Sequence, residues 1–116
     1  MVGSFAHIEI MVKDLKIARD FYGKIFGWKF EDMGPNYLVF TTGNGVGGGL
    51  MLDTKNFTDG PFILHIEVDD IPAALKQITS AGGKIEKEKT EIGGGFGSYA
   101  LFRDPSGNLL GIWSKT

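Results

Sequence analysis

The chain repeats one order of secondary-structure signals, and this repetition constrains its fold more than any other feature. Residues 5–12 alternate apolar and polar side chains as a β-strand does, and Asp14 is a suitable N-cap for the apolar helical pattern that follows. Gly27 ends that pattern. Three strands are then predicted, over residues 28–32, 37–42 and 46–52.

The same order returns in the second half of the chain. A strand is predicted over 61–68, Asp70 is the next N-cap, and a helix over 71–81 is predicted to end at Gly82–Gly83. Pro72 lies in its first turn, where a missing N–H is tolerated. Three strands again follow, over residues 84–92, 97–103 and 108–114.

The two halves agree in register as well as in order. Asp14 and Asp70 are 56 residues apart, and so are Gly27 and Gly83. We therefore interpret the chain as an internal duplication of a βαβββ module. The predicted fold class is α+β, with module one over about 5–53 and module two over about 61–115. The 116 residues suit a single domain, in which the modules form a curved, barrel-like mixed sheet with the helices outside.

Composition narrows the classes of function. Twelve Lys and Arg against fourteen Asp and Glu give a net charge of -2 without a basic run, so nucleic-acid binding is disfavoured. The sequence has no cysteine, which excludes thiolate chemistry and suits a reducing compartment. No stretch has the length and apolar character of a membrane span, and the first ten residues carry no secretory pattern. We expect a cytoplasmic protein that does not bind membranes.

Two similar sequence segments, HIEI at 7–10 and HIEV at 65–68, place a histidine near the start of each module. Their separation of 58 residues is two out of step with the helix caps, so the repeat partner of His65 is Glu9 and that of His7 is Ile63. A shift of two keeps a strand residue on the same face. We therefore expect one cavity wall made of His7, Glu9, Met11, His65 and Glu67, with Trp113 and the glycine-rich stretch 93–97 as an outer wall.

The stretches HIEIMVKDLKIARDFYGKIFGW, HIEVDDIPAAL, AGGK and FRDPSGNLLGIW resemble the vicinal oxygen chelate superfamily. This superfamily includes glyoxalase I, extradiol dioxygenases, methylmalonyl-CoA epimerase, and the fosfomycin- and bleomycin-resistance proteins. The resemblance implies paired βαβββ modules around a cupped cavity and a homodimer. It also implies that metal-dependent members take His, Gln or Glu ligands from the first and fourth strand of each module.

Carried onto this sequence, most of the ligand positions hold no donor. His7 occupies the first-strand position of module one, but Ile63 occupies that of module two. The fourth-strand positions fall on Gly49 and Gly111, and glycine has no side-chain donor. Divalent metals at catalytic sites need about three protein ligands. The resemblance therefore implies an incomplete metal site.

Two classes of function stay open at this point. The first is a small-molecule binding protein that holds a ligand in the cup without chemistry. The second is a metal-dependent lyase, isomerase or dioxygenase with a rearranged set of ligands, for which the candidates are His7, His65, Glu9 and Glu67. For His65 there is a further interpretation, in which it binds no metal and is hydrogen-bonded to Glu9 or Glu67. No catalytic residue, cofactor or substrate follows from the sequence, although a divalent metal is possible.

Overall fold

The computed structural model describes residues 3–53 and 62–116. The chain divides into two compact units, Met1–Phe57 and Thr58–Thr116, each of which contains one of the predicted modules. The elements of module one are β1 (Ile8–Val12), α1 (Leu15–Phe26), β2 (Lys29–Asp32), β3 (Tyr37–Thr41) and β4 (Gly48–Leu52). Those of module two are β5 (His65–Glu67), α2 (Ile71–Ser80), β6 (Lys84–Glu91), β7 (Ser98–Arg103) and β8 (Leu109–Ser114).

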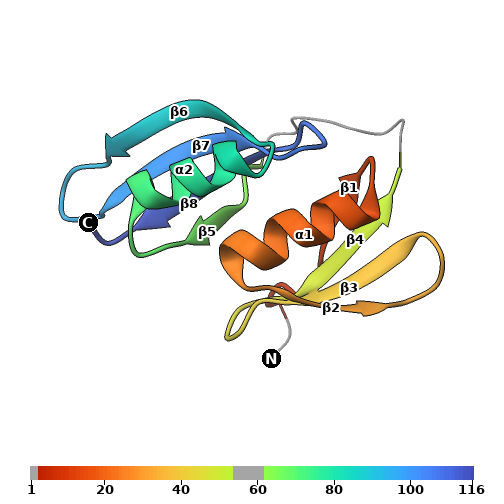
Figure 1. Ribbon diagram of the computed structural model, residues 1–116. Coiled ribbons are helices and arrows are strands. Elements are labelled where there is room, and N and C mark those ends of the chain that lie inside the picture. The colour runs from red at the N-terminus through yellow and green to blue at the C-terminus, as the bar shows by residue number, and fades with distance from the viewer. Residues whose placement is uncertain (1–2, 54–61) are drawn as a thin grey trace. The chain divides into compact units, whose positions relative to one another are not determined.

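Each module forms its own four-stranded mixed sheet, and the two sheets have the same topology (Figure 1). The strand orders are β1-β4-β3-β2 and β5-β8-β7-β6. In both sheets the first strand of the module pairs in parallel with its fourth strand, and the other pairings are antiparallel. The predicted α+β class and the duplicated βαβββ order are confirmed. That the modules join as one domain around a single cup stays a prediction.

The helix boundaries follow the predicted capping residues. The Asp14 carboxylate accepts a hydrogen bond from the backbone N–H of Ile17 at 2.9 Å, and Asp70 accepts one from Ala73 at 3.0 Å. Helix α1 ends at Gly27, whose φ of 72° is left-handed and therefore favours glycine. Helix α2 ends one residue earlier than predicted, because Ala81 is its C-cap and the chain turns at Gly82.

In module one, the apolar side chains on one face of the sheet pack against α1. The rings of Tyr22 on the helix, Trp28 and Phe40 on β3 form a continuous stack, with centroid separations of 4.7 and 4.4 Å. Ile10, Val12 and Leu50 are buried on the same face. Because strand side chains alternate, Glu9, Met11 and Tyr37 project from the opposite face.

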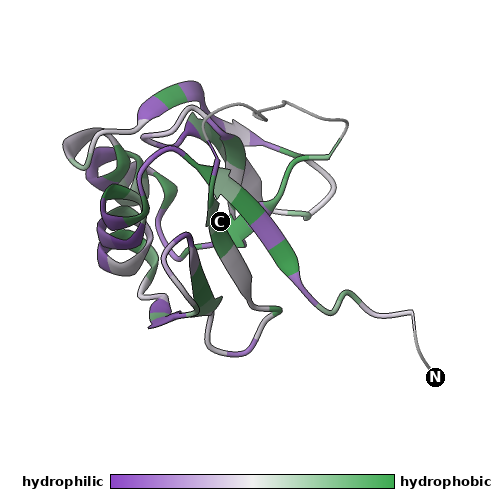
Figure 2. Cartoon of the chain, turned by 90° about the vertical axis from the view of Figure 1, so that its right-hand side faces the viewer, coloured by the Kyte–Doolittle hydropathy of each residue, from purple (hydrophilic) through white to green (hydrophobic). Residues whose placement is uncertain are grey.

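Module two follows the same plan. Helix α2 buries Ile71, Leu75 and Ile78, and the sheet buries Phe102 and Ile112. Figure 2, which colours the chain by hydropathy, shows hydrophilic and hydrophobic residues alternating along the helical ribbon, as in an amphipathic helix. In each module the sheet face away from the helix, called here the free face, is the one that carries the predicted site residues.

The first strand of each module is shorter than predicted. Strand β1 begins at Ile8, opposite Gly48, so that His7 lies just before the strand. Strand β5 contains only His65–Glu67, and Phe62, Ile63 and Leu64 are exposed and outside it. Residue 61, where the second strand was predicted to begin, lies outside the described residues. Strand β8 provides register partners for these three residues, and its backbone also forms hydrogen bonds with Leu64 and Val68 on either side of them. No helix in the described part of the chain is long and apolar enough to span a membrane.

Candidate functional site

Three polar side chains are linked by hydrogen bonds on the free face of module one. The Tyr37 hydroxyl lies 2.7 Å from Nε2 of His7 and donates to Oε2 of Glu9 at 3.0 Å. The rings of His7 and Tyr37 are nearly parallel, with an interplanar angle of 10°. The structure thus brings together two predicted site residues, His7 and Glu9, through a third residue, Tyr37, which was not among the predicted site residues.

Gly49 is what allows Tyr37 to reach the other two. Strand β4 lies between β1 and β3, with Gly49 paired to Glu9 on one side and Val39 on the other. A Cβ placed on Gly49 would overlap the hydroxyl and ring of Tyr37. The tyrosine therefore lies across β4, over the glycine, and its hydroxyl ends beside β1.

The donor and the acceptor can be assigned for each hydrogen bond in this triad of His7, Tyr37 and Glu9. Burial, the hydrogen bond to Glu9 and the charge of Glu9, in that order, raise the pKa of Tyr37 above its ordinary value of 10.0. The phenol therefore stays protonated and donates to Glu9. Its oxygen is then the acceptor for His7, which must carry its proton on Nε2. Nδ1 of the neutral His7 ring is left as an acceptor on the free face.

Module two uses a histidine where module one uses the tyrosine. His65 is the register partner of Gly111, and a Cβ placed on Gly111 would overlap the His65 ring. Nδ1 of His65 lies 3.1 Å from the carbonyl oxygen of Ile63. Since a carbonyl only accepts, Nδ1 carries the proton and Nε2 of the neutral ring is an acceptor. The expected partner of His65 was Glu9 or Glu67, whereas its hydrogen bond within the described residues is a local one to the backbone.

A second tyrosine lies beside His65. The ring of Tyr99 is edge-on to the His65 ring, with centroids 6.3 Å apart. The ammonium of Lys87 donates to the Tyr99 hydroxyl at 2.6 Å and lies 5.0 Å from the Tyr99 ring centroid. Lys87 was not predicted to have a role, because alternating charges over residues 84–91 are typical of a solvated edge strand.

The remaining predicted residues of module two are close to one another. Glu67 and Trp113 are register partners on β5 and β8. The indole N–H of Trp113 donates to the carbonyl of Phe96 at 2.8 Å, which ties β8 to the glycine-rich loop. The predicted outer wall of Trp113 and residues 93–97 is therefore one connected structure within this module.

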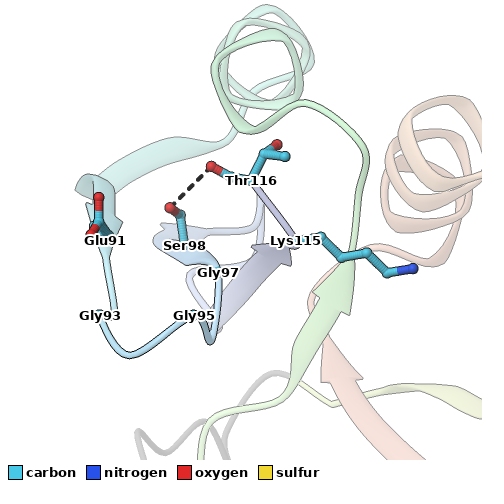
Figure 3. A pocket seen from close by; sticks show the side chains of 7 residues that line it. All are labelled: Glu91, Gly93, Gly95, Gly97, Ser98, Lys115 and Thr116. Atoms are coloured by element: carbon cyan, nitrogen blue, oxygen red, sulfur yellow. Dashed lines mark hydrogen bonds between the residues drawn. The ribbon is translucent and has the colours of Figure 1, made fainter.

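The glycine-rich loop also borders a hollow of about 190 Å³ beside the end of β8 (Figure 3). It is lined by Glu91, Gly93, Gly95, Gly97, Ser98, Lys115 and Thr116. The Ser98 hydroxyl is turned towards the Thr116 carbonyl and donates to it at 3.2 Å. Drug-sized ligands need about 300–1,000 Å³, so this hollow is too small to be the main binding site.

The last predicted residue, Met11, is half-buried on the free face of β1, paired with Met51. That module one contributes His7, Glu9 and Met11, and module two His65, Glu67 and Trp113, to one shared cavity stays a prediction.

The two positions at which a metal site needs carboxylates are unsuited to them. A side chain at Gly49 would meet Tyr37, and a side chain at Gly111 would meet His65. Over the described residues, neither module gathers three His, Asp or Glu side chains that could hold a metal ion. The donor set and the packing around the two glycines therefore do not fit the metal centre that the fold family uses.

Comparison with known proteins identifies the family. The sequence profile of the Glyoxalase/Bleomycin resistance protein/Dioxygenase superfamily matches residues 4–112. The chain belongs to this superfamily. A glyoxylase-like domain-containing protein of Didymella fabae is 26% identical, with 97% of this chain and 94% of that protein covered. The anthracycline biosynthesis protein DnrV of Streptomyces peucetius is 24% identical over 97% of this chain. The chain spans 47% of DnrV, about half its length.

Solved structures agree on the fold. The fosfomycin resistance protein FosX of Listeria monocytogenes superposes with a TM-score of 0.82 at 19% identity, covering 100% of this chain and 96% of that one. A superfamily enzyme from Burkholderia phytofirmans superposes with a TM-score of 0.78 at 19% identity, covering 96% and 98%. At sequence identities of 19%, the structural similarity to these two proteins shows a shared fold alone.

Proposed function

We propose that this superfamily member is a small-molecule binding protein that holds its ligand on the free faces of the two sheets without a metal ion. The observation that carries the proposal is the filling of both carboxylate positions by rings, by Tyr37 over Gly49 and by His65 over Gly111. In both modules a ring occupies the space that a side chain at the fourth-strand glycine would need, although a tyrosine provides the ring in one module and a histidine in the other. A fourth strand with a glycine under a ring offers no side-chain ligand for a metal ion at that position.

The triad of module one provides the polar recognition that a binding site needs. Ligand sites are mostly apolar, with a few polar groups fixed in orientation. His7, Tyr37 and Glu9 are fixed by the bonds between them, and Met11 and Val39 supply apolar surface on the same face. Nδ1 of His7 can accept a hydrogen bond and Glu9 can accept further ones, so the free face of module one suits a ligand group that donates.

The alternative is a metal-dependent lyase, isomerase or dioxygenase in which His7, His65, Glu9 and Glu67 bind the ion. A structure of the Listeria FosX protein holds Mn(II), which shows that the fold can carry such a metal. In this chain Glu9 and His7 are already engaged with Tyr37, and His65 is bonded to the backbone. Metal binding would have to break these hydrogen bonds.

The proposal is tested by screening a small-molecule library with ligand-observed NMR in the presence of EDTA. We expect hits that bind with EDTA present and weaken in Glu9→Gln, because the glutamine keeps the shape and removes the charge. Glu31→Gln is the matched control, since Glu31 is an exposed carboxylate on β2 of the same module. Hits that appear only when a divalent metal is added would contradict the proposal and favour the enzyme.

Two further expectations belong to the proposal. We expect a homodimer, as the resemblance implies, and sedimentation that gives a monomer at high concentration would count against it. We also expect a cytoplasmic protein that binds no nucleic acid and no membrane.

A further inference from the structure

The two modules place corresponding tyrosines in opposite electrostatic settings. Tyr37 pairs with the residue two positions after Gly49, and Tyr99 pairs with the residue two positions after Gly111, so the tyrosines are equivalent in register. Tyr37 donates its proton to a carboxylate, that of Glu9. Tyr99 instead accepts a proton from an ammonium, that of Lys87. The surroundings of Tyr37 in module one thus present acceptors, whereas those of Tyr99 in module two present donors.

A shift of register brings Lys87 to the free face. Ile85 pairs with the buried Phe102, and the next pair, Lys87 with Leu101, follows after an irregularity in β6. Since Leu101 and Tyr99 alternate with the core residues of β7, they lie on the free face, and Lys87 lies beside them. Lys87 and Tyr99 then meet although their strands pair them with other residues.

In the described part of the chain, no carboxylate neutralises the charge of Lys87. Over the described residues its ammonium is within ion-pair distance of no Asp or Glu. The neighbouring Glu86 is held at 2.8 Å by Arg103. Glu67 lies on β5, separated from β6 by β8 and β7. A cation with this surrounding is available to an anionic ligand.

Tyr99 adds a second donor at hydrogen-bond distance from the first. Its oxygen accepts from Lys87, and over the described residues its own proton is donated to no protein group. An ammonium and a phenolic O–H that are 2.6 Å apart match the two oxygens of a carboxylate. Leu101 and the rings of Tyr99 and His65 supply apolar surface next to these donors.

We propose that the free face of module two binds the carboxylate of a small organic acid, with Lys87 and Tyr99 as the two donors. This inference rests on the proposed binding function and names the chemical class of one end of the ligand. It concerns module two alone.

The test uses benzoate and its neutral isostere benzamide as probes, titrated into the full-length protein and followed by amide chemical shifts. We expect benzoate to shift the resonances of β6 and β7 and to bind more tightly than benzamide. Lys87→Gln should weaken benzoate about tenfold, and Tyr99→Phe by a smaller factor, because a charge-assisted hydrogen bond contributes more than a neutral one. Benzamide affinity should change little in either variant.

Lys89→Gln is the matched control, because it removes the same charge from the same strand but lies in a groove with Leu75 of α2. It should leave benzoate binding unchanged. Equal loss in Lys87→Gln and Lys89→Gln, or equal affinity for benzoate and benzamide in the unmodified protein, would overturn the inference while leaving the proposed function intact. If neither these probes nor any library compound bound, both would be wrong.

Discussion

The ring of Tyr37 lies over Gly49 and fills the space that any side chain at that position would need. His65 has the same relationship to Gly111 in the other module. In both sheets the glycine belongs to the fourth strand, which pairs in parallel with the first. In both modules, therefore, a glycine on the fourth strand leaves room for a ring from a neighbouring strand.

Two neighbouring glycines of β4 should respond differently to alanine. In Gly48→Ala the new Cβ would overlap the backbone of Ile8, which is fixed by the sheet, whereas in Gly49→Ala it would overlap the end of the Tyr37 side chain, which can rotate. We expect Gly48→Ala to destabilise by about 1–3 kcal/mol or more, as overpacking does, and Gly49→Ala by less. Urea unfolding measures both.

The hydrogen bonds among His7, Tyr37 and Glu9 provide a second way to compare the Gly48→Ala and Gly49→Ala variants. Gly49→Ala should break the hydrogen bonds of Tyr37 to His7 and Glu9, whereas Gly48→Ala should not act through them. A Gly49→Ala protein in which the resonances of His7 and Glu9 are unchanged would show that the tyrosine is not positioned by the glycine.

The protonation of Tyr37 gives a pH-dependent prediction. Burial and Glu9 raise the pKa of Tyr37 above 10.0, so the folded protein holds the phenolic proton more tightly than the unfolded chain. The resulting contribution to stability is complete below the ordinary pKa and is lost as the pH rises through the raised pKa. Phenolate absorbance, taken as the difference from Tyr37→Phe, should titrate above 10.0 and move down in Glu9→Gln. An unchanged titration in Glu9→Gln would argue against the hydrogen bond.

The two N-caps should contribute similar stability. Asp14→Ala and Asp70→Ala each remove one carboxylate that accepts a backbone N–H at the start of a helix. We expect each to cost about 1 kcal/mol in the free energy of unfolding, and Asn to restore most of the loss. A change in only one of the two would contradict the equivalence of the modules. The exposed Asp20, on the surface of α1, provides a control substitution to Ala.

A metal site should be recoverable by reversing the change in module one. Tyr37→Ala opens the space over β4, and Gly49→Glu adds a carboxylate beside His7 and Glu9, which makes three donors on one face. We expect the double variant to gain affinity for Mn²⁺ or Ni²⁺ by calorimetry. Gly49→Glu alone should gain less, since Tyr37 still fills the space. No gain in the double variant would mean that the missing carboxylate is not what limits metal binding.

The duplication could be predicted from the sequence because caps and glycine stops are local signals that repeat with one spacing. The sharing of a face by His7 and Glu9 also followed, from strand alternation alone. The triad itself did not, because the reach of Tyr37 across β4 depends on a glycine on a different strand. Lys87 was missed for a related reason: the irregular pairing of β6 changes which of its alternating charges face the same side as Tyr99.

The metal content of the purified protein tests the central claim most directly. The protein would be incubated with Mn²⁺, Fe²⁺, Co²⁺, Ni²⁺ and Zn²⁺ in turn, dialysed, and analysed by mass spectrometry for each element beside a His7→Ala variant. If Tyr37 and His65 fill the ligand positions, the protein and the variant should both retain far less than one equivalent of any metal. One equivalent that survives dialysis and is lost in His7→Ala would contradict the account and favour a metal-dependent enzyme.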